Sequence, residues 1–366
     1  MNRRAARPGR NLLLRWAIGL VAFVSLVVGA PAAASASNDW DAAELTVMTR
    51  NLYLGADLTP ALTAPPESFL AAVAHIYDTA QGTDFPARAE AIADEIKANR
   101  PDLVGLQEVS RWKTSGPGVQ ATLDFLPVLM SALSERRLHY TVAAVARNAS
   151  IGPIPLVNPP CASAVVGACL VTLQDRDVIL VNEDRAGLRW NRPRAGTYEA
   201  QQSFVPPGGE PVSFKRGWVT IEGSLKGRPF HFANTHLETE ASPVVQEAQA
   251  AEFLAGPALG RGADIATGDF NSAADGSTTT SYAQLTKVFT DAWGVNRGLP
   301  GLTCCQNEKL DNPVSKLSSR IDLVLSLHGA SAISAHLVGG TPFQKAPPLW
   351  ASDHAGVVAT LRLEGW

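Results

Sequence analysis

The stretch Asp264-Ile265-Ala266-Thr267-Gly268-Asp269-Phe270-Asn271 leads from an apolar run into a cluster of small and polar residues. We interpret its first four residues as a strand. Asp269 and Asn271 are two positions apart, so extended backbone directs both side chains to the same face. Gly268 allows close approach of backbone or ligand. The stretch therefore predicts a strand end that presents a carboxylate and an amide, with an Asx turn as the ordinary alternative.

Other expected strand ends carry the same kinds of side chain. They are Asn51, Gln107-Glu108, Asn234-Thr235-His236, Arg320-Ile321-Asp322 and Ser352-Asp353-His354. Carboxylate and amide oxygens suit Mg²⁺, and a carboxylate beside an imidazole fixes its tautomer and raises its basicity. Each cluster alone has an ordinary reading as a turn, a solvated strand end, a cap or a salt bridge. Together they predict one pocket in which water is activated to attack phosphorus.

The pattern of apolar residues predicts strands and helices in both halves of the chain. Strands are expected at 45–52, 102–109, 140–146, 168–174, 177–182, 264–267, 321–327 and 356–363, with a hairpin of 218–225 and 229–235. Helices are expected at 67–79, 86–99, 122–137, 243–254 and 281–293. Because no repeat or low-complexity linker divides the chain, we expect one large domain with two sheets face to face and helices outside.

The first 36 residues read as a secretory leader. Five arginines precede the apolar run Trp16–Ala30, and Ala34-Ser35-Ala36 fits a signal-peptidase site. The run is shorter than the ~20 residues that a membrane-spanning helix needs. We expect residues 1–36 to be a signal peptide and the mature protein to be secreted, with an uncleaved N-terminal anchor as the alternative.

The mature chain is expected to be acidic. Removal of the leader leaves 26 basic residues against 34 acidic ones, a formal charge of −8 at neutral pH. Tight binding to nucleic acid irrespective of sequence depends on Lys and Arg that displace counterions from phosphates. No segment alternates Lys, Arg and aromatic residues in the way that would follow a nucleic-acid backbone. The charge therefore disfavours a general polyanion binder.

The four cysteines are Cys161, Cys169, Cys304 and Cys305. An even number in a chain expected to be exported favours disulfides over a metal site. Cys161 and Cys169 would close a small loop. Cys304 and Cys305 are adjacent and would form a vicinal disulfide or pair elsewhere, so three connectivities are open.

In their order along the chain, the polar clusters resemble the endonuclease/exonuclease/phosphatase superfamily of metal-dependent hydrolases. That superfamily includes deoxyribonucleases, abasic-site endonucleases and bacterial neutral sphingomyelinases. The resemblance spans nearly all of residues 37–366, which we expect to form one catalytic domain. It implies an α/β (α+β) four-layer sandwich of two mainly antiparallel sheets packed face to face, with helices outside and the active site at one rim. The implied cofactor is Mg²⁺, with Mn²⁺ as a second choice.

The resemblance also implies roles for individual residues. The metal ligands would be Asn51, Glu108 and Asp353. The catalytic residues would be His236, Asp269, Asn271, Asp322 and His354. In this scheme His354, held by Asp322, is the general base, Asp269 and Asn271 orient the water, and His236 stabilises charge on the phosphate. Whether Asp269 or His354 takes the proton stays open. Arg216 and Asn234 are expected to contact the substrate.

These observations predict a secreted, Mg²⁺-dependent phosphoesterase that hydrolyses a phosphodiester or phosphomonoester by in-line attack of water. A lipid head group or small diester is favoured as substrate, on the charge and on the apolar loop Pro347–Trp350 before Asp353. One alternative is an extracellular nuclease acting on DNA or RNA. Another is a catalytically inert binding module on the same fold. No stable protein partner is implied, and we expect a monomer.

Overall fold

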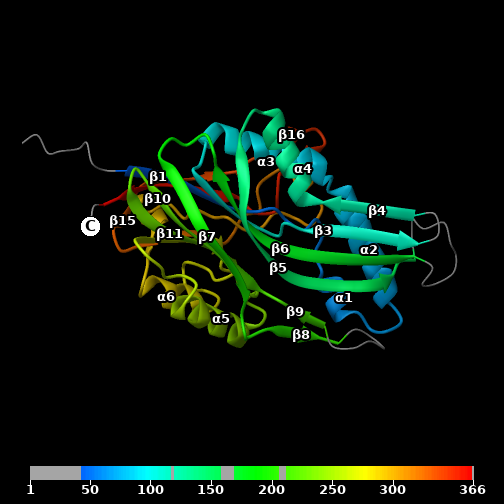
Figure 1. The fold of residues 1–366 in the computed structure, drawn as a ribbon. Helices are drawn as coiled ribbons and strands as arrows, with labels where there is room; N and C mark the ends of the chain where they lie inside the picture. The colour runs from blue at the N-terminus through cyan, green and yellow to red at the C-terminus, as the bar shows by residue number, and fades with distance from the viewer. Residues whose placement is uncertain (1–42, 117–118, 158–168, 206–211, 365–366) are drawn as a thin grey trace, which may run out of the picture. The chain divides into compact units, whose positions relative to one another are not determined.

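The computed structural model describes residues 43–116, 119–157, 169–205 and 212–364. The strands of this part form two large sheets and two small ribbons (Figure 1). The expected leader, residues 1–36, lies outside the described residues. Within the described ranges, no helix combines the length and apolar character needed to cross a membrane.

The first sheet has eight strands in the order β15-β18-β1-β2-β6-β3-β4, with β5 also paired to β6. They are β1 (Ala43–Asn51), β2 (Leu103–Gln107), β3 (Arg111–Gly116), β4 (Val119–Asp124), β5 (Tyr140–Pro155), β6 (Leu170–Asn182), β15 (Ala330–Val338) and β18 (Gly356–Leu363). Only the β1–β2 pair is parallel among these strands. The carboxyl ends of β1 and β2 therefore meet at one edge of the sheet.

The second sheet has six strands in the order β13-β14-β12-β11-β10-β7. They are β7 (Leu188–Thr197), β10 (Gly217–Leu225), β11 (Arg228–His236), β12 (Ala263–Asp269), β13 (Thr290–Asp291) and β14 (Asp322–Leu327). β11 and β12 run parallel, and the other pairs are antiparallel. The expected β10–β11 hairpin is confirmed. Lys226 and Gly227 both have positive φ, the geometry of a two-residue type I′ turn.

Helices cover the outer faces of both sheets. They are α1 (Thr59–Thr63), α2 (Phe69–Gly82), α3 (Phe85–Asn99), α4 (Phe125–Glu135), α5 (Pro243–Ala255) and α6 (Ser281–Thr286). The 3₁₀ helix η2 (Ala292–Val295) instead packs Ala292 and Trp293 into the core between the sheets. The ribbons are β8 (Gln202–Phe204) with β9 (Val212–Phe214), and β16 (Gln344–Lys345) with β17 (Pro348–Leu349). α3 and α4 lie on one side of the sheets and α5 and α6 on the other (Figure 1).

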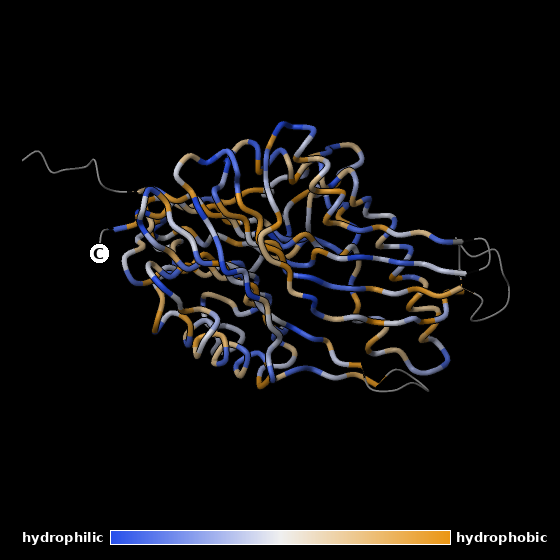
Figure 2. The backbone as a smooth tube through the Cα atoms, in the orientation of Figure 1, coloured by the Kyte–Doolittle hydropathy of each residue, from blue (hydrophilic) through white to orange (hydrophobic). Residues whose placement is uncertain are grey.

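Alternation along the strands builds three apolar layers. Met48 of β1 packs with α2, α3 and α4, whereas its neighbour Val47 packs between the two sheets with Phe232 and Ile265. Successive strand residues point to opposite faces, so one apolar strand serves both layers. The third layer joins α5 and α6 to the outer face of the second sheet. Figure 2 shows these interior strands as largely hydrophobic segments. The expected four-layer sandwich is confirmed.

Some expected element boundaries are wrong. The helix expected at 122–137 begins only at Phe125, because Asp124 ends β4 and its carboxylate caps the helix at Leu126 N, 3.2 Å away. The helix expected at 281–293 ends at Thr286, and Thr290–Asp291 instead pairs with β14. The strands expected at 168–174 and 177–182 form one strand, β6.

The structure places Cys304 and Cys305 side by side in the arrangement of a vicinal disulfide. This placement agrees with one of the two arrangements expected for that pair, the vicinal disulfide. The expected Cys161–Cys169 bond involves Cys161, which lies outside the described residues.

Candidate active site

The ends of three neighbouring strands place polar side chains in a row across the second sheet. His236 ends β11 and pairs in register with Asp269, which ends β12. Asp269 in turn faces Asp322, the first residue of β14. The parallel β11–β12 pair brings two carboxyl ends to the same edge, and the antiparallel β14 begins there. Three residues far apart in sequence thus share one rim.

The corresponding edge of the first sheet supplies the opposite wall. Asn51 ends β1, and Glu108 follows β2 directly with a φ of 53°, which is unusual for a residue other than glycine. The Asn51 amide nitrogen lies 3.0 Å from Asp269 Oδ2 and 3.3 Å from Glu108 Oε1. The rims of the two sheets therefore meet at Asn51.

His354 lies just before β18 and is held by carboxylates. Its Nδ1 is 2.8 Å from Asp322 Oδ2, and its Nε2 is 3.7 Å from Asp269 Oδ2 and 3.9 Å from Asp353 Oδ1. Ser352 Oγ accepts a hydrogen bond from His354 N at 3.1 Å. The ring is thus fixed at Nδ1, and Nε2 faces the carboxylates of Asp269 and Asp353.

A second group surrounds His236. The amide nitrogen of Asn271 lies 3.0 Å from His236 Nε2 and also donates to the carbonyl of Leu237. The guanidinium of Arg216 lies 3.0 Å from His236 Nδ1 and 3.5 Å from Glu238. Burial and the neighbouring Arg216 charge hold the pKa of His236 well below its ordinary value, so this imidazole is neutral. The structure therefore places the cationic Arg216 and the neutral His236 side by side.

The electrostatics of the site favour a bound cation. Burial, with the charges of Asp353 and Asp175, raises the pKa of Glu108 to about 7. Burial and Asp322 raise the pKa of Asp269 to about 7. Burial makes both carboxyl groups costly to ionise, and a bound cation would favour their charged forms. Carboxylate and amide oxygens crowded in this way form a donor set that fits a hard divalent ion.

The charge of His354 follows from the same carboxylates. Burial opposes protonation of the ring, but Asp322, Asp353 and Asp269 outweigh it and raise the pKa of His354 well above its ordinary value. Asp269, Asp322 and His354 each offer a ligand atom within 4.8 Å of the others. A cation that neutralises these carboxylates would therefore also favour the neutral imidazole.

Two acidic residues of β6 join the site although the sequence reading passed over them. Asp177 is fully buried, and the amide of Asn148 on β5 lies 2.8 Å from Asp177 and 3.1 Å from Asp175. Both aspartates lie close enough to His236 to share an ion with it. Their spacing could have shown this: Asp175 and Asp177 are two positions apart, so both point to the same face of a strand. We instead expected a break between two strands here.

Two buried arginines hold the loops of the site and were also missed. Arg88 of α3 donates to the carbonyls of Leu52, Tyr53 and Ala351, at 2.6, 3.1 and 3.2 Å. Arg50 donates to the backbone carbonyl of His354 and to both oxygens of Glu95. These contacts fix the segments that carry Asn51 and His354. A helical arginine gives no such signal in sequence, because its partners are backbone atoms distant along the chain.

The loop with the vicinal disulfide supports the same residues from the other side. Thr303 Oγ1 accepts hydrogen bonds from Ile321 N and Asp322 N, each at 3.1 Å. The backbone of this loop also pairs with Asp353 and Ala355. Cys305 Sγ lies 3.9 Å from His354 Nε2. The loop therefore positions Asp322 and His354 relative to each other.

Asn234 is not placed to bind a substrate as expected. Its side chain is fully buried between the two sheets, where it accepts from Gln107 Nε2 at 2.6 Å and donates to Leu106 O at 3.0 Å. A Cβ at Gly105 would come within 2.5 Å of the Asn234 carboxamide oxygen, so glycine is needed opposite it. The amide satisfies backbone groups of the first sheet and joins the two sheets.

Comparison with known proteins agrees with this geometry. The Endonuclease/Exonuclease/phosphatase family matches residues 73–354, which include every residue of the site except Asn51 and Arg50. The chain belongs to this family. Members of the family are metal-dependent phosphoester hydrolases, which makes the chain an enzyme of that class.

Solved structures share the fold at low sequence identity. A family protein from Bacteroides thetaiotaomicron has 17% identity and a TM-score of 0.55, covering 88% of this chain and 99% of its own. One from Beutenbergia cavernae has 21% identity and a TM-score of 0.52, covering 88% and 72%. A mannosyl-6-phosphatase of Bacteroides thetaiotaomicron has 17% identity and a TM-score of 0.53, covering 87% and 99%. No curated protein matches the sequence. At these identities the likeness establishes the fold of this family member.

Proposed function

We propose that the chain is a Mg²⁺-dependent phosphodiesterase in which water attacks phosphorus in line. The observation that carries this proposal is the meeting of both sheet rims at Asn51, which lies 3.0 Å from Asp269, with His354 held beside them by Asp322. That arrangement combines hard oxygen donors with an oriented imidazole. Such a combination serves activation of water at a phosphoester.

Asn51, Glu108 and Asp353 are the proposed metal ligands. The Asn51 amide nitrogen lies 3.3 Å from Glu108 Oε1, and the Asn51 amide oxygen accepts from Tyr53 N at 2.8 Å. The pKa of Glu108 and the pKa of Asp353 are both raised, chiefly by burial. These carboxylates fit Mg²⁺ or Mn²⁺. When bound, the ion would polarise the phosphoryl oxygen and neutralise charge that develops there.

His354 is the proposed general base, and Asp322 is its positioning residue. With Nδ1–H donated to Asp322, the lone pair of a neutral ring lies on Nε2. That nitrogen faces Asp269, whose Oδ1 is held by Asn271 N at 3.0 Å. Asp269 and Asn271 would orient the attacking water between them. His354 Nε2 would then accept its proton.

Arg216, His236 and Asn271 form the proposed phosphate-binding side. Arg216 is partly exposed and carries a fixed positive charge, whereas His236 is neutral beside it. A neutral imidazole and a carboxamide can donate to phosphate oxygens, and the guanidinium can neutralise them. Negative charge that accumulates on phosphorus oxygens during the attack would be stabilised at this side.

The substrate proposed is a lipid or other small phosphodiester, handled by a protein secreted after removal of residues 1–36. The formal charge of −8 after that removal disfavours a nucleic-acid backbone. The same chemistry also fits a nuclease. Plasmid nicking at a higher catalytic efficiency than hydrolysis of small or lipid diesters would assign the substrate to nucleic acid.

The test is hydrolysis of bis-p-nitrophenyl phosphate by residues 37–366 with Mg²⁺ or Mn²⁺. We expect turnover that needs the ion and falls at least about 100-fold in Glu108→Gln, since a metal ligand is lost. Glu183→Gln, at an exposed glutamate after β6, is the matched control and should keep the wild-type rate. Absence of turnover on a panel of phosphodiesters and monoesters, or full activity of Glu108→Gln, would reject the proposal.

A further inference from the structure

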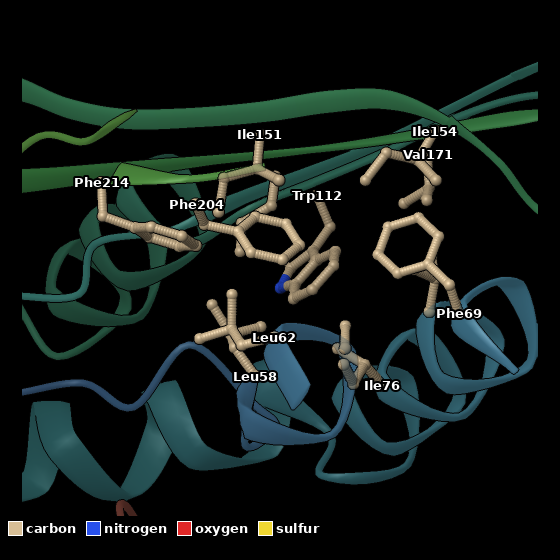
Figure 3. Close-up of a pocket in the computed structure, with 13 residues that line it drawn as sticks. Leu58, Leu62, Phe69, Ile76, Trp112, Ile151, Ile154, Val171, Phe204 and Phe214 are labelled. Atoms are coloured by element: carbon tan, nitrogen blue, oxygen red, sulfur yellow. The ribbon is translucent and has the colours of Figure 1, made fainter. Parts of the chain in front are cut away.

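An apolar pocket lies between α1, α2 and the strands β3, β5, β6, β8 and β9. All thirteen residues that line it are apolar, and Figure 3 shows Trp112 at its centre between Phe69, Phe204 and Ile151. The one polar atom of the Trp112 side chain, Nε1, is already bonded to the carbonyl of Leu54 at 2.8 Å. The pocket therefore offers a ligand contact area without hydrogen-bonding groups.

The pocket lies close to the catalytic site, because two short segments of its wall also contact or carry site residues. Leu54 donates its N–H to Glu108 Oε2 at 2.6 Å and accepts from Trp112 at its carbonyl, so one residue links the proposed metal ligand to the pocket wall. On the other side, Phe214 lines the pocket and is two residues before Arg216. Two residues of extended chain span at most about 7 Å. Both walls of the pocket thus continue into segments that carry site residues.

We propose that this pocket receives the alkyl chain of an amphiphilic phosphoester whose phosphate occupies the site beside Glu108 and Arg216. The proposal rests on the proposed function and names its substrate class. A sugar or nucleobase in this pocket would lose its hydrogen bonds to water without replacement, which is unfavourable. An alkyl chain loses none and gains from burial.

One exposed apolar side chain lines the pocket, and another follows a lining residue directly in sequence. Leu62 lines it and is 39% exposed, and Val205, next to the lining residue Phe204, is 61% exposed. Apolar surface around an opening suits entry of a chain from a micelle or bilayer.

The kinetic test is a series of methyl, butyl and octyl p-nitrophenyl phosphates below their critical micelle concentrations. We expect kcat/KM to rise by about fourfold for each methylene that enters the pocket. Ala61→Trp, which fills the pocket from α1, should bring the octyl-to-methyl ratio close to one. Val244→Trp places the same side chain at an exposed site on α5 and should keep the wild-type ratio. A wild-type ratio near one, or an unchanged ratio in Ala61→Trp, would overturn the proposal.

A binding test separates this inference from the proposed function. Calorimetry with octylphosphonate and methylphosphonate needs no turnover. We expect the wild type to bind octylphosphonate more tightly than methylphosphonate, and Ala61→Trp to bind the two with equal affinity. Leu62→Glu, at the partly exposed mouth, is the second variant if Ala61→Trp does not fold, and it should remove the same preference. Preference for the octyl compound without any hydrolysis would reject the phosphodiesterase and support the pocket. Hydrolysis with equal binding of both phosphonates would reject the pocket alone.

Discussion

The carboxamide of Asn51 and the carboxylate of Asp269 are 3.0 Å apart, although 218 positions separate them and they belong to different sheets. Asn51 ends β1 and Asp269 ends β12, so the contact joins the rims of the sandwich. Neither sheet alone contains both a complete set of oxygen donors and the imidazole pair. The site therefore exists only when the two sheets are packed together, and its chemistry depends on the packing between them.

We predict that divalent metal stabilises the protein more at about pH 8 than at about pH 6. The raised pKa of Glu108 and Asp269, each about 7, means that the folded state binds these protons more tightly than the unfolded state. Their contribution to stability is present at acid pH and is lost as pH rises from about 4 to about 7. A metal binds the ionised carboxylates and recovers the loss, by about 2.7 kcal/mol at a hundredfold excess over Kd.

Thermal unfolding with and without Mg²⁺ at the two pH values measures this effect. The metal-induced rise in Tm should be the larger at the higher pH. Glu108→Gln should reduce both the rise and its dependence on pH. Equal shifts at both pH values in the wild type would contradict the assignment of the ion to these carboxylates.

The sequence predicted the layers because the apolar alternation is strong in the central strands. β18 was expected at its observed bounds, Gly356–Leu363, and α5 within one residue of its end. The strands β3, β4, β7 and β15 were missed, and the last three of these lie at sheet edges. β7 is polar and mostly exposed, and the pattern of a strand that packs little apolar surface is weak.

Site residues at the ends of apolar strands could be predicted from the sequence. Residues whose roles depend on contacts between distant parts of the fold could not. Asp269 ends the buried strand β12 and His354 lies just before β18, so their place at the rim could be inferred from the strand pattern. The buried Asp177 and Arg88 take their roles from contacts across the fold. Asn234 has the residue type and position of a ligand-binding amide, but the close approach of the two sheets at Gly105 encloses it.

A second prediction concerns the pair of His354 and Asp322. His354→Gln should lower kcat by about 10² to 10⁴, the usual contribution of a general base. Activity should fall on the acid side as His354 takes up a proton. Asp322 raises the pKa of His354, so Asp322→Asn should move that acid limb to lower pH while kcat falls.

Profiles of kcat/KM against pH for the wild type and both variants measure the two effects. If the role of Asp322 is purely structural, Asp322→Asn should lower kcat/KM at every pH and leave the acid limb of the profile at its wild-type pH. An acid limb unchanged in His354→Gln with residual turnover would assign the base to another group, with Asp269 the next in line.

A third prediction concerns the buried Arg88, whose pKa burial lowers to about 10. Arg88→Leu leaves the carbonyls of Leu52, Tyr53 and Ala351 without their donor in the core. We expect the free energy of unfolding to fall by about 3 kcal/mol or more, because each unpaired buried carbonyl is costly. Arg192→Leu, at an exposed position of β7, should change it by no more than about 0.5 kcal/mol.

Urea unfolding of the two variants gives the comparison. Equal stabilities would show that water replaces the guanidinium at these carbonyls. In that case Arg88 would not be the residue that holds the Asn51 and Asp353 loops in place.

The last prediction separates sheet packing from substrate contact at Asn234. Asn234→Leu removes the acceptor of Gln107 Nε2 and the donor to Leu106 O within the interface of the sheets. We expect a loss of about 2 to 4 kcal/mol in the free energy of unfolding, since buried polar partners are left unpaired. KM of the folded fraction should stay near the wild-type value, because the side chain does not reach the site surface. A raised KM at unchanged Tm would return Asn234 to the substrate side and contradict its assignment to the interface between the sheets.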